Sequence, residues 1–161
     1  MAISKSKVLM LFIAFLFIGA LLLSIFPPNA PRTFLNHRRA VQSMRSLSIA
    51  ERSYAERHPE TGFACNLRDL GEPRSLSTPQ TGSIDQVLAS GTKFFYHFEI
   101  ACDQGPSQKT TDYTITAVPT DPGRTGLYAL CTDQSGDIWY SANGSASDCL
   151  QSHKLIEQKY R

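Results

Sequence analysis

Apolar and polar positions alternate with a different period in successive parts of the chain, and the first part is almost wholly apolar. Residues 8–26 carry no charged side chain. A helix of about 20 apolar residues, with a rise of about 1.5 Å per residue, matches the roughly 30 Å hydrocarbon layer of a bilayer. The pattern therefore predicts a transmembrane helix at 8–26, preceded by a cytoplasmic N-terminus at 1–7.

The flanks of this stretch bear on whether it is retained. Lys5 and Lys7 precede it, and a proline-rich break follows at 27–32. A cleaved signal peptide is the alternative, but its apolar core spans about 7–15 residues and ends at a small-x-small site. Here prolines surround the one suitable position, after Ala30. We expect a retained single-pass anchor in the inner (cytoplasmic) membrane, with the C-terminal domain in the periplasm or outside the cell.

The next stretch has helical periodicity. Residues 33–58 contain neither glycine nor proline, and Pro59 follows them. Apolar side chains recur there at steps of three and four, which are the steps of an amphipathic helix. They are Val41, Met44, Leu47, Ala50 and Tyr54. The stripe predicts a helix that packs against a sheet and ends before the proline.

Beyond Gly91 the period changes to two, which is typical of half-buried strands. The alternation predicts strands at 94–101 and 113–118, then a hairpin of 127–132 with 137–141. Between helix and strands, 62–81 has the composition of a loop and 84–89 that of a short helix capped by Ser83.

These elements predict an α+β fold. It consists of an N-terminal transmembrane helix followed by an amphipathic helix packed on a three- to four-stranded antiparallel sheet. The extracytoplasmic domain would span 33–149, and 150–161 would be a C-terminal tail with a frayed end.

The four cysteines all lie beyond the apolar stretch, at Cys65, Cys102, Cys131 and Cys149. Their spacing shows no C-x-x-C pair and no alternation with histidine, so it favours two disulfides over a metal site. Disulfides indicate an oxidising compartment. Of three possible pairings we favour Cys65 with Cys102 and Cys131 with Cys149, because each closes a loop within one local unit; buried free thiols are the alternative.

Charge is distributed unevenly. Residues 1–58 carry eight Lys or Arg and two Glu, whereas the rest carries eight against twelve acids. Arg32, Arg38 and Arg39 would be membrane-proximal, where contact with anionic headgroups is worth about 1 kcal/mol per charge; simple solvation is the alternative. The lipid bilayer is thus an expected partner. Aromatic residues are not interleaved with a basic run, so no nucleic acid is expected.

No constellation of reactive side chains emerges. The four histidines lie apart from any Cys, Asp or Glu at metal-ligand or catalytic spacing. They are His37, His58, His97 and His153. Asp133 and Asp137 alone supply too few oxygens for calcium, and the sequon at 143–145 is interpreted as a turn. We expect no enzyme, no catalytic or metal-binding residue and no cofactor.

Several segments together resemble a known family. They are RAVQSMRSLSIAERSYAERHPETGFAC (39–65), SIDQVLASGTKFFYHFEI (83–100), YTITAVP (113–119), LCTDQSGDIWY (130–140) and the last Cys149. This pattern resembles the type IV pilin-like, or pseudopilin-like, proteins of Acidobacteria-type genomes. The resemblance implies a long N-terminal helix laid on a four-stranded antiparallel sheet, a disulfide near the C-terminus, and a role in a pilus or secretion pseudopilus.

One family feature is missing. Prepilins carry a peptidase site and a glutamate at the start of the apolar helix, but Ser4 to Lys7 do not match that site and Glu51 is the first acidic residue. A buried intramembrane carboxylate is costly and marks a function, so its absence speaks against filament packing of the usual kind. We expect a membrane-anchored pilin-like structural or assembly protein, as a minor or non-polymerising component of a type IV pilus or type II secretion-like system.

The expected partners are then other pilin or secretion-system subunits. The alternative is a membrane-tethered periplasmic binding module for a protein or small ligand. That module would use the exposed face of the sheet or the loop at 62–81, and it predicts a concave apolar patch beside that loop.

Overall fold

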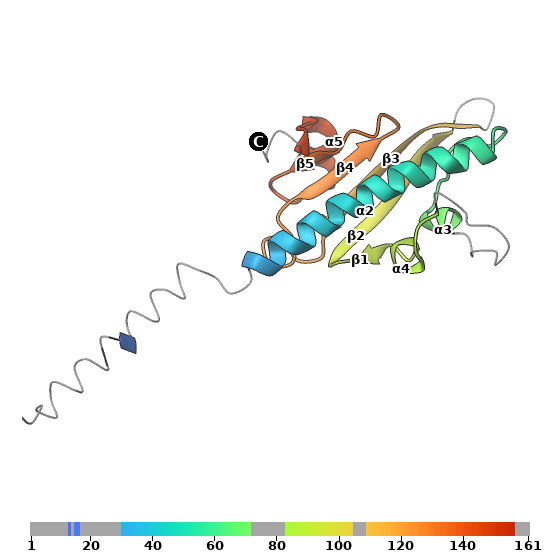
Figure 1. Ribbon diagram of the computed structural model, residues 1–161. Helices are drawn as coiled ribbons and strands as arrows, with labels where there is room; N and C mark the ends of the chain where they lie inside the picture. Colours follow the sequence, from blue (N-terminus) through green and yellow to red (C-terminus); the bar gives the residue numbers. More distant parts are fainter. Residues whose placement is uncertain (1–12, 14, 17–29, 72–82, 105–108, 157–161) are drawn as a thin grey trace, which may run out of the picture. The chain divides into compact units, whose positions relative to one another are not determined.

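The computed structural model describes residues 13, 15–16, 30–71, 83–104 and 109–156 (Figure 1). The chain divides into two compact units, Met1–Pro31 and Arg32–Arg161. In the first unit the described residues Ile13, Phe15 and Leu16 are helical and exposed. The second unit holds the sheet and the disulfides.

The prediction of a membrane-spanning helix is contradicted. Over the described ranges, no helix is long and apolar enough to cross a membrane. The long helix is α2 (Ala30–Arg57), and six arginines along it exclude it from a hydrocarbon layer. The predicted fold class, with its transmembrane helix, and the predicted single-pass localisation in the inner membrane are therefore both overturned. The predicted segments 1–7 and 8–26 lie almost entirely outside the described residues.

Helix α2 begins at Ala30, three residues before the start that the sequence predicts. Proline is tolerated in a first helical turn, where the missing N–H has no carbonyl partner, so Pro31 does not break the helix. The Oγ1 of Thr33 donates to the Arg124 carbonyl at 3.1 Å, and the Nδ2 of Asn36 donates to the Thr125 carbonyl at 3.0 Å. These bonds hold the first turns of α2 on the loop that follows β3.

The apolar stripe of α2 is confirmed in its position against the sheet. Met44 and Leu47 are fully buried and Ala50 is 1% exposed, whereas Val41 and Tyr54 are half-buried at the margins. Steps of three and four return to the same side of a helix, so this face is the one that meets the core.

Five antiparallel strands form one sheet in sequential order, which corrects the predicted three or four (Figure 1). The additional strand is β1, which has two residues. The strands are β1 (Thr92–Lys93), β2 (Tyr96–Gln104), β3 (Thr110–Pro119), β4 (Ala129–Asp133) and β5 (Trp139–Ser141). Each pairs with the next along the chain, as a meander requires.

One face of the sheet receives α2. Phe98 of β2, Ile115 of β3 and Leu130 of β4 are at most 1% exposed and belong to one core with Leu47. Residues between them, such as Glu99, point to the other side, because successive side chains alternate across a strand. The sheet thus has one apolar face and one polar face over β2 and β3.

The C-terminal segment packs on the protein instead of fraying. Helix α5 (Ala146–Ser152) contacts β4 and β5, and Leu155 then bridges to Trp139 of β5. The backbone N–H of Ile156 donates to the Ile138 carbonyl at 2.9 Å, and its side chain is 2% exposed. The predicted frayed end is therefore wrong for the described residues up to 156.

Two one-turn helices lie on the other flank, near β1 (Figure 1). Asn66 caps α3 (Leu67–Leu70), inside the segment that the sequence predicts as loop. Asp85, and not the predicted Ser83, caps α4 (Gln86–Ala89), because its Oδ1 accepts from two backbone amides at 3.1 Å. Carboxylate and amide oxygens at such positions satisfy amides that have no partner within the helix.

The turn between β1 and β2 has unusual backbone geometry. Phe94 and Phe95 adopt φ angles of 52° and 62°, in the left-handed region that bulky residues rarely enter. The sequence predicts a strand that begins at Phe94, but Phe94 and Phe95 form a two-residue hairpin turn, and their φ angles are those of type I′, which has positive φ at both central positions. The Phe95 carbonyl accepts from Thr120 N at 2.9 Å and Thr120 Oγ1 at 3.2 Å. Its surroundings therefore hold a conformation that costs about 1–2 kcal/mol per residue.

Replacing Phe95, which is 59% exposed, tests this strain. We expect Phe95→Gly to have a free energy of unfolding about 1 kcal/mol higher than Phe95→Ala, because only glycine adopts positive φ without a steric penalty. Denaturant melts of the two variants measure the difference. An alanine variant as stable as the glycine variant would show that the turn is not strained.

Candidate functional site

The side of α2 that faces away from the sheet carries large apolar side chains. Phe34, Leu35 and Ile49 are 43%, 45% and 59% exposed. Isolated exposed apolar residues are common, but a row of them along one helix indicates a contact surface.

We define the outer stripe as five residues of α2 at steps of four, three, four and four, which place them on one side of the helix. They are Phe34, Arg38, Val41, Arg45 and Ile49. A shallow hollow of about 360 Å³ lies along this stripe, lined by Phe34, Arg38, Val41, Gln42 and Arg45. Arginine stems add apolar surface while their guanidinium groups remain charged, so the stripe suits an apolar partner with an acidic rim.

The predicted membrane-proximal basic residues do not form one cluster. All three, Arg32, Arg38 and Arg39, are exposed. Arg38 belongs to the outer stripe, whereas the guanidinium of Arg39 lies 5.1 Å from the centre of the Phe94 ring, beside β1. Arg38 and Arg39 therefore lie on different surfaces of α2.

Two disulfides are present, with the pairing that the sequence favours. Cys65 joins Cys102 across 37 residues, and Cys131 joins Cys149 across 18 residues. The first ties the segment after α2 to β2, and the second ties α5 to β4. Each bond thus connects a short element to a strand of the sheet.

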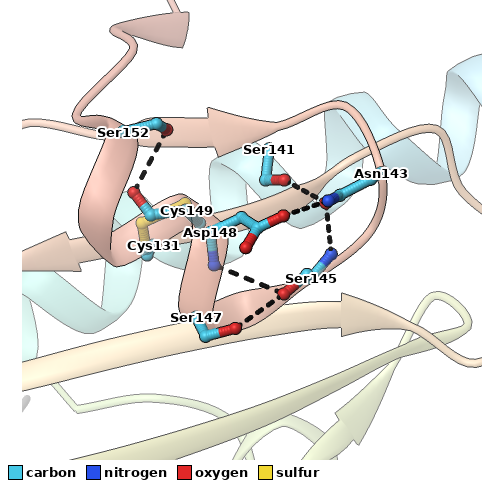
Figure 2. The surroundings of a disulfide bond; sticks show 8 residues. All are labelled: Cys131, Ser141, Asn143, Ser145, Ser147, Asp148, Cys149 and Ser152. Carbon is cyan, nitrogen blue, oxygen red and sulfur yellow. Dashed lines mark hydrogen bonds between the residues drawn. A yellow bond between two sulfur atoms is a disulfide. The ribbon is translucent and has the colours of Figure 1, made fainter.

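The loop enclosed by the second disulfide has a network of hydrogen bonds (Figure 2). The Oδ1 of Asn143 accepts from Ser141 Oγ and, at 3.0 Å, from the Ser145 backbone, while its Nδ2 donates to Asp148. Ser145 Oγ accepts from the Asp148 backbone at 3.3 Å and so caps α5. Because these polar groups bond one another, the network positions α5, and the sequon at 143–145 is a structural turn as predicted from the sequence.

The four histidines lie in four different settings. His37 is buried, with Nδ1 3.1 Å from the Tyr96 hydroxyl, and His97 lies 3.1 Å from Glu99 on the polar face of the sheet. His58 stacks on Tyr54, and the ring of His153 meets Trp139 edge-on. Within the described residues, no three His, Cys, Asp or Glu side chains are arranged to hold a metal ion.

The surface expected for a binding module combines polar and apolar groups. A groove of about 680 Å³ lies beside the first disulfide, and Arg68, Asp69, His97 and Glu99 contribute to its walls. The exposed side chains of β2 and β3 include Glu99, Asp103 and Asp112. The groove also has apolar walls at Leu67, Phe98 and Ile100, so the concave patch that this alternative predicts is present in mixed form, with charged side chains among the apolar ones.

Glu51 is the residue that the sequence interpretation missed. Its side chain is fully buried, Oε2 accepts from the Ala64 backbone at 2.9 Å, and Oε1 has no hydrogen-bond partner among the residues that the structure describes. Burial raises the pKa of Glu51 to about 7, against the lowering effect of the Ala64 bond. Glu51 follows Leu47 by four residues and Met44 by seven, so its place on the buried stripe is visible in the sequence.

Comparison with known proteins identifies no relative. Family models, curated proteins and solved structures all give no match to this chain. The resemblance to pilin-like proteins therefore stays a prediction from the residues.

Removing a disulfide should lower the free energy of unfolding, and the loss should be larger for the disulfide that closes the longer loop. We expect the Cys131→Ala/Cys149→Ala variant to lose about 3 kcal/mol of unfolding free energy, and Cys65→Ala/Cys102→Ala about 4 kcal/mol, because a longer loop gains more entropy when unfolded. Urea melts of both variants measure this order. A loss below about 1 kcal/mol in either variant would contradict the expected contribution of its disulfide.

Proposed function

We propose that this chain is a pilin-like structural or assembly protein, a minor or non-polymerising component of a type IV pilus or type II secretion-like system. Its partners would be other pilin or secretion-system subunits. The observation that carries the proposal is the outer stripe of α2, where Ile49 is 59% exposed in the middle of a helix whose opposite face is already buried.

The architecture supports an assembly role. Helix α2 has 28 residues, and the outer stripe from Phe34 to Ile49 offers a row of contacts about 22 Å long, at about 1.5 Å per residue. The sheet fixes the other face of this helix, so the outer stripe is presented on a rigid support. A rigid support favours binding because less conformational entropy is lost when the partner docks.

Energetics indicate which residues would matter most. Burying one large apolar side chain contributes about 1.5–3 kcal/mol. Ile49 has the largest exposed fraction of the large apolar residues on α2, so its burial would gain the most. Arg38, an exposed residue of the same stripe, would favour a partner with carboxylates at its rim.

The binding-module alternative has less support. It would place a ligand in the groove beside Cys65, but Arg68, Asp69 and Glu99 line that groove together with its apolar groups. Ligand pockets are usually lined by apolar and aromatic side chains with only a few polar groups. We therefore rank the assembly role first.

Affinity purification of the tagged full chain from its native source tests the proposal. We expect pilus or secretion-system subunits to be recovered with the wild type and lost with Ile49→Arg, because the new charge would be buried without a partner. Val87→Arg is the matched control, since Val87 is 57% exposed but lies on α4.

Both variants should melt within about 0.5 kcal/mol of the wild type, because exposed positions tolerate substitution. Recovery of no such subunit with the wild type would reject the proposed function. Equal recovery with Ile49→Arg would reject the outer stripe as the contact surface.

A further inference from the structure

Glu51 lies where three parts of the protein meet. It projects from the buried face of α2 toward the segment Gly62–Cys65, which we call the strap, and its charge acts on Tyr113 of β3. The bond from Ala64 N to Glu51 Oε2 is the contact that joins the middle of the strap to α2. Ala64 itself is 1% exposed, so this bond is screened from water.

Both ends of the strap are fastened independently of Glu51. Phe63 N donates to the Thr110 carbonyl at 3.2 Å, and Gly62 forms a bridge to Thr110. At the other end, Cys65 is bonded to Cys102. A change at Glu51 can therefore loosen the middle of the strap while its ends stay in place.

The groups around Glu51 do not favour its ionised form. Asp69 of α3 is a second carboxylate whose charge disfavours ionisation. Tyr113 of β3 is an uncharged phenol at neutral pH, and burial raises its pKa further, to about 12. Arg52 follows on α2, but its guanidinium lies near Gly136, in the turn after β4, where a Cβ would be 2.9 Å from Nη2. Asp133, at the end of β4, adds another negative charge on the Tyr113 side.

We propose that Glu51 is a proton-operated latch for the strap. When protonated, its neutral carboxyl stays buried and holds Ala64 against α2. When ionised, the unpaired charge costs more to bury than the Ala64 bond returns, so the side chain turns toward water and the strap opens in the middle. This property is separate from the proposed assembly role and does not depend on it.

The direction of the pH effect follows from the raised pKa. The folded protein binds the Glu51 proton more tightly than the unfolded chain, where the pKa is 4.5. The stabilisation is fully present below that value and is lost as pH rises through about 7. The latch is thus closed in mildly acidic solution and open in alkaline solution.

Hydrogen exchange at the Ala64 amide, followed by NMR on the full chain, tests the latch. After correction for the intrinsic rate, we expect the opening equilibrium of Ala64 in the wild type to rise by up to about tenfold per pH unit between pH 4.5 and about 7 and to level off above that. Glu51→Gln keeps an acceptor and cannot ionise, so its Ala64 opening should not change with pH. Glu56→Gln, an exposed carboxylate on the same helix, should behave as the wild type.

Two further measurements on the wild-type protein distinguish the latch from a general loss of stability. The carboxyl carbon of Glu51 in the wild type should titrate with a midpoint near 7, which requires no variant to fold. The Ala64 amide should have a lower opening free energy than the Ile115 amide, in the centre of β3, because Ile115 exchanges only through global unfolding. A midpoint below about 5, the same pH response in Glu51→Gln, or equal opening free energies at Ala64 and Ile115 would each overturn the latch.

Discussion

The packing of α2 on one face of the sheet is the interaction on which the rest of this structure depends. Leu47 and Met44 meet Phe98, Ile115 and the neighbouring strands in a single core, and no other described helix has a buried stripe of comparable length. One face of α2 is buried in this core, so the opposite face is the one that can contact a partner protein. The same packing also forces Glu51, which lies on the inner face, into a buried site where no cation among the described residues is paired with it.

The small elements around this core are held by covalent and polar bonds as well as by apolar contacts. Helix α3 has four residues and α5 has seven, which is too short for either to be stable alone. One disulfide joins the segment just before α3 to β2, and the other joins α5 to β4. The side chains of Asn66 and Ser145 cap the first turns of α3 and α5. Removing a bond therefore affects a local element first.

Patterns with a clear period were predictable. The three-and-four spacing from Met44 to Ala50 identified the buried face of α2, and the alternation at Phe98 and Ile115 identified the inner face of the sheet. The disulfide pairing also followed from local loop closure. These features depend on residues close together in the sequence, where local rules apply.

Features that depend on tertiary context were missed. Strand β1 has two residues and its turn uses Phe94 and Phe95, where turn chemistry favours Asn-Gly, so no local signal marks it. The contact between Glu51 and Ala64 joins residues 13 positions apart, through a fold that must already exist. The apolar run at 8–26 met the criterion for a span, but no described helix does.

Native-state hydrogen exchange along α2 is the most direct test of the central packing. The account predicts that the amides of Leu47 and Ala50 exchange only through global unfolding, with the same opening free energy as the Ile115 amide of β3. Exchange at Leu47 and Ala50 with an opening free energy lower by about 2 kcal/mol or more would show that α2 leaves the sheet while the strands remain folded, which would contradict the account.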